Sequence, residues 1–193
     1  MAVTPSTMLP LGTRAPGFSL LNAVDGTRVA LSDFREKRAL LVMFVCNHCP
    51  YVVHVREELT RLGADYLPQG VGIVAINANS SKTHPQDGPS AMKQLAQQLG
   101  WQFPFLFDET QQVAKAYRAA CTPDFFLFDD RTRLVYRGQL DDSRPGNGIA
   151  VTGKDLRAAI DALLAGRAVS DQQKPSIGCN IKWNAGNEPD YFG

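Results

Sequence analysis

The sequence lacks several features that would assign it to a large class of proteins. It has no apolar run near the ~20 residues of a membrane-spanning helix, and residues 1–10 carry neither the basic nor the apolar segment of a secretion signal. It also lacks a charge excess of either sign, since 20 Lys and Arg against 19 Asp and Glu leave a formal net charge of +1. We therefore expect a cytoplasmic protein that binds neither nucleic acid nor an anionic membrane.

Cysteine is scarce as well. The chain of 193 residues has four, at positions 46, 49, 121 and 179, too few for a scaffold held together by disulfides. In a reducing cytosol, two cysteines separated by only two residues indicate redox chemistry or metal binding rather than a structural cross-link.

The apolar residues predict alternating strands and helices. Residues 39–45 form a continuous apolar run, typical of a strand buried on both faces, and helical spacing follows over 50–67. A second apolar run over 71–78 completes a strand–helix–strand unit. Further predicted elements are helices at 92–99, 111–118 and 155–164, a strand at 103–107, and hairpins around Asp25-Gly26 and from 125–128 to 134–137. These elements predict a single α/β domain over 1–193, with a loose arm over 1–12 and an irregular tail over 170–193.

The cysteine pair lies where the first long strand passes into the first long helix. The reactive form of a cysteine is the thiolate, and a helix N-terminus can lower a thiol pKa from about 8.5 to roughly 3.5–7.5. We expect Cys46, just ahead of the helix, to be the nucleophile and Cys49, one turn on, to resolve the mixed disulfide. A positive charge on His48, between them, would stabilise the reduced pair and make it more oxidising.

A metal site is the alternative use of this pair. A structural zinc ion takes four ligands, usually from a second close pair, whereas Cys121 and Cys179 are isolated in the sequence. His48, His54 or His84 would have to complete the ligand set of a metal-binding or copper-delivery module. Since two thiols can carry the electrons themselves, the redox prediction requires neither a cofactor nor a metal.

The other two cysteines allow two interpretations each. Cys121 comes directly before Thr122-Pro123 and is either a small buried apolar residue or an additional redox thiol. Cys179 lies in the tail, either as a thiol that folds back over the pair or as a packing residue beside Trp183.

The order of these elements resembles the thioredoxin fold, and the N-terminal text resembles the AhpC/TSA (peroxiredoxin-like) redoxin branch with a Cys-x-x-Cys motif. The segments that carry the resemblance are 15–18, 25–34, 44–52, 120–125 and 178–183. It implies a central mixed sheet flanked by helices, with an N-terminal β-hairpin extension. It also implies that Pro123 is a cis-proline facing the dithiol, and that Thr122 offers backbone groups to an extended substrate.

The sequence departs from these families at two points. Typical peroxiredoxins have proline seven residues and Thr or Ser three residues before the peroxidatic cysteine, and counting back from Cys49 these positions hold Val42 and Cys46. The buried aspartate of thioredoxin corresponds to Leu40, so the proton acceptor for Cys49 must be another group, such as His54, Glu57 or a water.

We therefore expect a thiol–disulfide oxidoreductase that acts on protein or small-molecule disulfides and is served by an upstream thiol reductant. Cys46 and Cys49 are its expected catalytic residues, supported by His48, Thr122 and Pro123. The alternatives are a peroxiredoxin-like thiol peroxidase and the metal-binding module.

Overall fold

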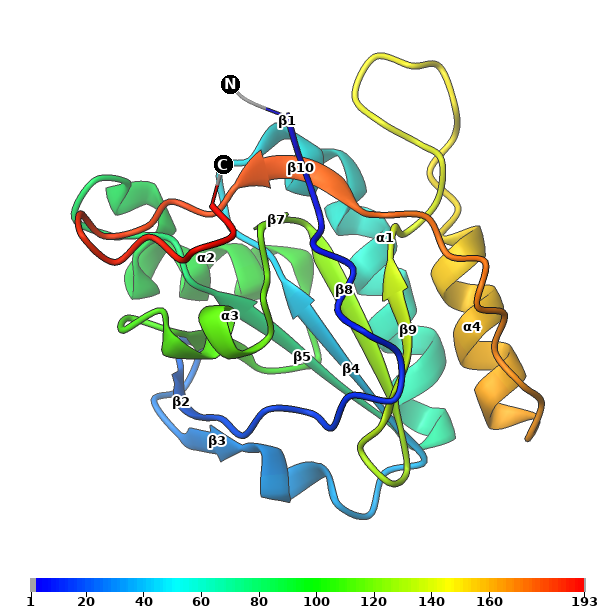
Figure 1. Cartoon of the computed structure of the whole chain (residues 1–193). Coiled ribbons are helices and arrows are strands. Elements are labelled where there is room, and N and C mark those ends of the chain that lie inside the picture. Colours follow the sequence, from blue (N-terminus) through cyan, green and yellow to red (C-terminus); the bar gives the residue numbers. More distant parts are fainter. Residues whose placement is uncertain (1–2, 193) are drawn as a thin grey trace.

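A seven-stranded mixed sheet forms the centre of the part of the chain that the computed structural model describes, residues 3–192. Its strands are β2 (Ser19–Asn22), β3 (Arg28–Ala30), β4 (Ala39–Phe44), β5 (Val71–Asn77), β6 (Phe105–Phe107), β8 (Asp124–Asp129) and β9 (Leu134–Gly138). They lie in the order β3-β2-β6-β5-β4-β8-β9. β4 pairs parallel with β5 and antiparallel with β8, so it runs through the middle of the protein (Figure 1).

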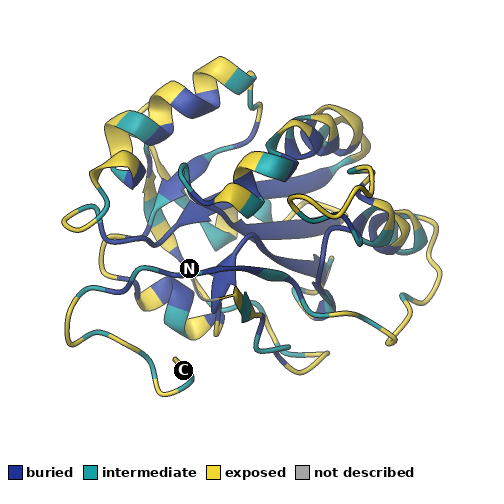
Figure 2. Ribbon diagram, turned by 90° about the horizontal axis from the view of Figure 1, so that it is seen from above, coloured by how far each residue is buried: buried dark blue, intermediate teal, exposed yellow. Residues whose placement is uncertain are grey.

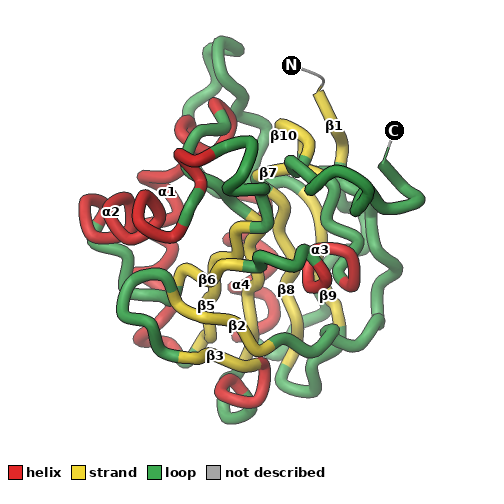
Figure 3. Tube along the Cα trace, turned by 90° about the vertical axis from the view of Figure 1, so that its left-hand side faces the viewer, coloured by secondary structure: helices red, strands yellow, loops and turns green. Residues whose placement is uncertain are grey.

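Helices cover both faces of this sheet. They are α1 (Pro50–Tyr66), α2 (Pro89–Leu99), α3 (Gln112–Ala116) and α4 (Lys154–Leu164), with single 3₁₀ turns η1 (Leu31–Phe34), η2 (Leu67–Gln69) and η3 (Pro85–Asp87). Buried residues of α1, α2 and α4 pack in one core cluster, and those of α3 pack in the other together with residues near both ends of the chain. In Figure 3, α1 and α2 lie on one side of the strands and α3 lies on the other side.

The central strand contributes to both core clusters. All six residues of β4 are buried, and because side chains alternate along a strand, Leu41 and Met43 face α1 whereas Val42 and Phe44 face α3. Burying one such side chain stabilises the fold by roughly 1.5–3 kcal/mol. The buried strands are the dark centre of Figure 2, and they fix the start of the segment that carries the cysteine pair.

A second, three-stranded sheet lies beyond the carboxyl end of β4, at the top of Figure 1. It consists of β1 (Val3–Pro5), β10 (Ile177–Asn180) and β7 (Cys121–Thr122) in the order β1-β10-β7. The arm and the tail therefore each contain a strand that the sequence did not predict. Each strand is short, and it is ordered by a partner far away in the chain rather than by its own apolar pattern.

The other predicted elements are confirmed, with ends shifted by one to three residues. The hairpin of β2 and β3 turns at Asp25-Gly26, where Gly26 adopts a φ of 77°, and β8 and β9 form the second hairpin. The structure thus confirms a mixed sheet flanked by helices. No helix among the described residues is long and apolar enough to span a membrane.

Candidate active site

The cysteine pair lies in the short segment between β4 and α1, as predicted. Helix α1 begins at Pro50, and Cys49 is its N-cap residue, with φ −63° and ψ 125°. Cys46 lies three residues earlier, and both side chains are buried, with 0% exposure. Cys49, rather than Cys46, is therefore the cysteine at the start of the helix.

The acidity of the two thiols is the reverse of the prediction. A hydrogen bond from the Cys46 thiol is the largest cause that lowers the pKa of Cys49, from an ordinary 9.0 to about 4. The Cys179 side chain, the Val52 N–H and the Cys179 N–H also donate to the Cys49 sulfur and so outweigh its burial. The pKa of Cys46 is raised by its hydrogen bond to Cys49, by burial and by the negative charge of Asp87. Even if the hydrogen bond between the two sulfurs is left out of account, three groups donate to Cys49 and lower its pKa. The Asp87 carboxylate near Cys46 has the opposite effect and raises the pKa of that thiol. Cys49 is therefore the thiol of the pair whose pKa is lowered, and Cys46 is the one whose pKa is raised.

Thr122 and Pro123 lie against the pair, and the Thr122-Pro123 peptide bond is cis, as the resemblance implied. The Thr122 hydroxyl is 3.4 Å from the Cys46 sulfur, and the thiol form of Cys49 donates to the Thr122 carbonyl oxygen at 3.2 Å. Thr122 is also the register partner of Cys179 in β10. Strand β10 thus pairs with the Thr122 backbone that the resemblance assigns to an extended substrate.

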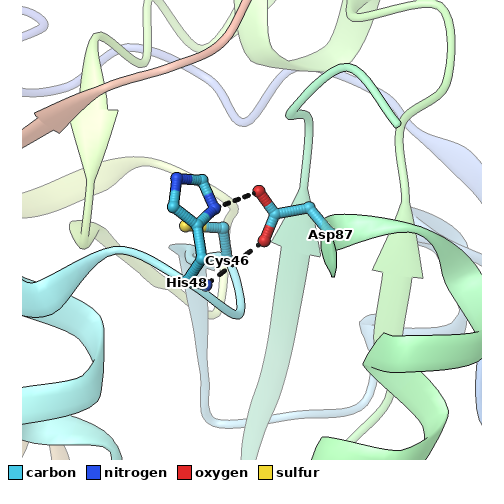
Figure 4. A group of neighbouring side chains, drawn as sticks. All are labelled: Cys46, His48 and Asp87. Carbon is cyan, nitrogen blue, oxygen red and sulfur yellow. Dashed lines mark hydrogen bonds and ion pairs between the residues drawn. The ribbon is translucent and has the colours of Figure 1, made fainter. Parts of the chain in front are cut away.

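His48 is held by the carboxylate of Asp87, a residue that is not among the predicted candidates (Figure 4). His48 Nδ1 is 2.5 Å from Oδ2 of Asp87, which is fully buried. Asp87 Oδ1 accepts the backbone N–H groups of Asn47 (2.8 Å) and His48 (3.3 Å), and Oδ2 accepts the Asn79 side chain (2.8 Å). The loop after β5 therefore fixes the Cys46–Cys49 segment, and the Asp87 charge offsets the effect of a protonated His48 on Cys46.

The other two histidines have partners of their own. The His84 ring stacks on His48 with centroids 5.0 Å apart, and burial lowers its pKa, as do the charges of His48 and Lys182. His54 Nε2 hydrogen-bonds to the Ser143 hydroxyl at 2.7 Å, which favours a packing histidine over a proton acceptor for the dithiol.

One group of side chains could hold a metal ion. Ligand atoms of Cys46, His48 and Asp87 lie within 4.8 Å of one another. Both oxygens of Asp87 already accept hydrogen bonds, from Asn47, His48 and Asn79. An ion bound there would have to replace the contact between His48 Nδ1 and Asp87.

The structure separates the two remaining cysteines. Cys179 contacts the Cys49 sulfur through both its thiol and its backbone N–H. The Cys121 thiol instead donates to the Pro123 carbonyl oxygen at 3.6 Å, and burial, together with the Asp124 charge, raises its pKa. The structure brings most of the predicted candidates together at one site: Cys46, Cys49, His48, Thr122, Pro123 and Cys179. The Cys121 thiol lies beside this site and hydrogen-bonds to a backbone oxygen, that of Pro123, rather than to a sulfur of the pair.

This combination of a mixed sheet, a cysteine pair at a helix start and a neighbouring cis-proline defines a thioredoxin-like redox protein. The chain belongs to the redoxin family, because the family model described as Redoxin matches residues 10–156. Among its relatives, the thiol-disulfide oxidoreductase ResA of Geobacillus thermodenitrificans is 30% identical over 133 residues, 68% of this chain and 70% of ResA. Membership of this family confirms the expectation of an oxidoreductase.

Solved structures support the same assignment. An uncharacterized conserved protein from Geobacillus kaustophilus is 58% identical with a TM-score of 0.94, covering 95% of this chain and 97% of that protein. The thioredoxin domain of a thiol-disulfide oxidoreductase from Bacteroides vulgatus is 19% identical with a TM-score of 0.55, covering 67% of this chain and 88% of that domain. The second likeness concerns the fold alone, and it confirms the predicted thioredoxin-like fold.

Proposed function

We propose that this protein exchanges disulfides through the Cys46–Cys49 dithiol. The observation that carries the proposal is the contact between the two sulfurs at the start of α1, where hydrogen bonds lower the Cys49 pKa to about 4. The expected substrates are disulfides of proteins or small molecules, and an upstream thiol reductant returns the dithiol to its reduced form. We further propose a cytoplasmic location, which cell fractionation tests directly.

The order of attack follows from the acidity of the thiols. The Cys49 thiolate attacks one sulfur of a substrate disulfide, whose S–S bond breaks, and the first substrate thiolate leaves and takes up a proton. Cys46 then loses its proton and attacks the Cys49 sulfur. This releases the second substrate thiol and forms the Cys46–Cys49 disulfide, so two electrons pass from the protein to the substrate.

His48 and Thr122 serve this reaction by position. The contact with Asp87 fixes the His48 ring, and the Asp87 bonds to Asn47 and His48 N–H fix the backbone between the cysteines. The Thr122 hydroxyl, 3.4 Å from the Cys46 sulfur, can donate to it while Cys46 is losing its proton.

Substitution of each cysteine tests the proposal. We expect Cys49→Ser to abolish reduction of insulin disulfides by dithiothreitol above the uncatalysed rate, and Cys46→Ser to reduce turnover strongly. Cys121→Ser is the matched control and is expected to retain wild-type activity, since the Cys121 thiol hydrogen-bonds to the Pro123 carbonyl oxygen rather than to a sulfur of the pair. Full activity of both the Cys46 and the Cys49 variants would rule out the dithiol.

Peroxide reduction is a second candidate, favoured by the same thiolate. Cys49 would attack one peroxide oxygen, giving a sulfenic acid and water, and Cys46 would then form the disulfide and release a second water. Stopped-flow mixing with hydrogen peroxide tests this reaction. A rate of thiol loss equal to that of free cysteine excludes it.

A further inference from the structure

The tail brings a third sulfur to the dithiol. Strand β10 runs antiparallel to β7, with Cys179 opposite Thr122, and the Thr122 carbonyl oxygen is 3.2 Å from the Cys49 sulfur. The thiol and the N–H of Cys179 both hydrogen-bond to that sulfur. Cys49 therefore lies between two thiols, Cys46 from its own segment and Cys179 from the far end of the chain.

Cys179 is held in this position by the strands on either side of it. On one side Cys179 is the partner of Val3 in β1, and on the other of Thr122 in β7. The preceding residue, Gly178, packs so closely that a Cβ atom there would overlap the Thr122 carbonyl oxygen. Cys179 itself is 3% exposed. A thiol fixed beside a reactive sulfur is oriented for attack, which is the main requirement of an intramolecular reaction.

The reduced site keeps this third thiol protonated. Burial raises the pKa of Cys179 to about 12, helped by the hydrogen bond to Cys49 and by the Cys49 charge. The last two causes disappear once the Cys49 sulfur is part of a disulfide and carries no charge. Cys179 thus becomes easier to deprotonate at the step at which a second thiolate is needed.

We propose that Cys179 is a third catalytic thiol, which resolves the mixed disulfide on Cys49 by forming a Cys49–Cys179 disulfide. This inference rests on the proposed function. Cys179 loses its proton and attacks the Cys49 sulfur, the bond from Cys49 to the substrate sulfur breaks, and the leaving thiolate takes up a proton. Cys46 can then attack Cys49 in turn and release Cys179 as a thiol, an exchange that needs no further oxidant. Cys49 therefore has two resolving partners.

The experiment compares two variants of the full chain. Reduced Cys46→Ser and reduced Cys46→Ser/Cys179→Ser are treated with glutathione disulfide, and the products are measured by mass spectrometry of the intact protein. In the single variant we expect Cys179 to expel the glutathione, which leaves a Cys49–Cys179 disulfide. The double variant is expected to retain one glutathione on Cys49. Cys46→Ser/Cys121→Ser is the matched control and is expected to behave like the single variant.

The outcomes separate the two proposals. If the single and the double variant retain glutathione equally, the role of Cys179 is wrong while attack by Cys49 stands. If the folded double variant acquires no glutathione, the proposed function itself fails. Proteolysis of the oxidised single variant gives a second readout that does not depend on how well a Cys179 variant folds. A cross-linked peptide pair containing Cys49 and Cys179 supports the proposal, and a peptide carrying glutathione on Cys49 contradicts it.

Discussion

The acidity of Cys49 predicts how the reduction potential of the dithiol changes with pH. With a pKa of about 4 for Cys49 and a raised pKa for Cys46, the reduced pair holds one proton near neutral pH. Reduction of the disulfide then takes up one proton. An ordinary dithiol takes up two protons in this range. Because a tenfold change in a two-electron equilibrium corresponds to about 30 mV, the potential should fall by about 30 mV per pH unit rather than about 59 mV.

The pKa of Cys49 also determines how far the reduction potential of the dithiol is shifted at neutral pH. A thiolate stabilises the reduced form by about 1.4 kcal/mol for each pH unit above its pKa. Between a pKa of about 4 and pH 7 this amounts to about 4 kcal/mol, or roughly 90 mV toward the oxidising end. We therefore expect a potential nearer the roughly −180 mV of protein disulfide isomerase than the roughly −270 mV of thioredoxin. This stabilisation of the folded, reduced protein is present above the ordinary thiol pKa and is lost as the pH falls through about 4.

Equilibration with glutathione buffers of known ratio, between about pH 5.5 and 8, measures the potential when the remaining thiols are alkylated and counted by mass spectrometry. Cys179→Ala removes one donor to Cys49, so it should raise the Cys49 pKa and lower the potential at pH 7. Cys121→Ser is the matched control and should leave both the slope and the potential unchanged. A slope of about 59 mV per pH unit throughout would show that Cys49 is protonated and would refute the assigned acidity.

Three further predictions concern stability. Asp124 is fully buried, its Oδ1 has no partner among residues 3–192, and burial raises its pKa, so it destabilises the fold as the pH rises above its ordinary value of 3.8. The free energy of unfolding of Asp124→Asn, measured with urea, should therefore increase relative to that of wild type by about 1.4 kcal/mol per pH unit as the pH rises above 3.8. A difference that does not vary with pH contradicts this. Gly178→Ala should lower the free energy of unfolding by about 1–3 kcal/mol, because the added Cβ forces β10 away from Thr122. An unchanged melting temperature would disprove the close packing. Buried Glu58 is 2.6 Å from both Arg61 and Arg157, so Arg157→Met should cost about 2 kcal/mol, less than the 3–5 kcal/mol for a carboxylate left unpaired. In the double variant with Glu58→Gln most of that cost should disappear, and a cost that persists contradicts the pairing.

The sequence was sufficient for the parts of the site that depend on neighbouring residues. The six apolar residues of β4, the cysteine pair and Pro50 at the start of α1 follow one another directly, so local patterns placed Cys46 and Cys49 correctly. Pro123 was placed by resemblance, since no local pattern indicates a cis peptide bond. The structure reverses the predicted order of acidity because two of the donors that lower the Cys49 pKa come from Cys179, which β10 brings from the far end of the chain.

The rest of the site depends on contacts between distant parts of the chain. Asp87 lies in the loop after β5, and only the fold shows that its carboxylate binds the segment between the cysteines. In the sequence, Cys179 and Cys121 are both isolated cysteines, and a redox role is equally open for each. The pairing of β10 with β7, which brings Cys179 to Cys49 and leaves Cys121 bonded to Pro123, distinguishes them.

Strand β10 links access to the dithiol with its reactivity. Cys46 and Cys49 are fully buried, so a disulfide can reach the Cys49 sulfur only when some covering segment moves, and β10 contacts that sulfur directly. If β10 moves away, Cys49 loses the two donors of Cys179, which lower its pKa, and it also loses burial, which raises its pKa. Displacement of β10 would therefore open Cys49 to a disulfide and withdraw the Cys179 thiol from it in the same movement, while the closed form keeps the pair covered and the third thiol beside it.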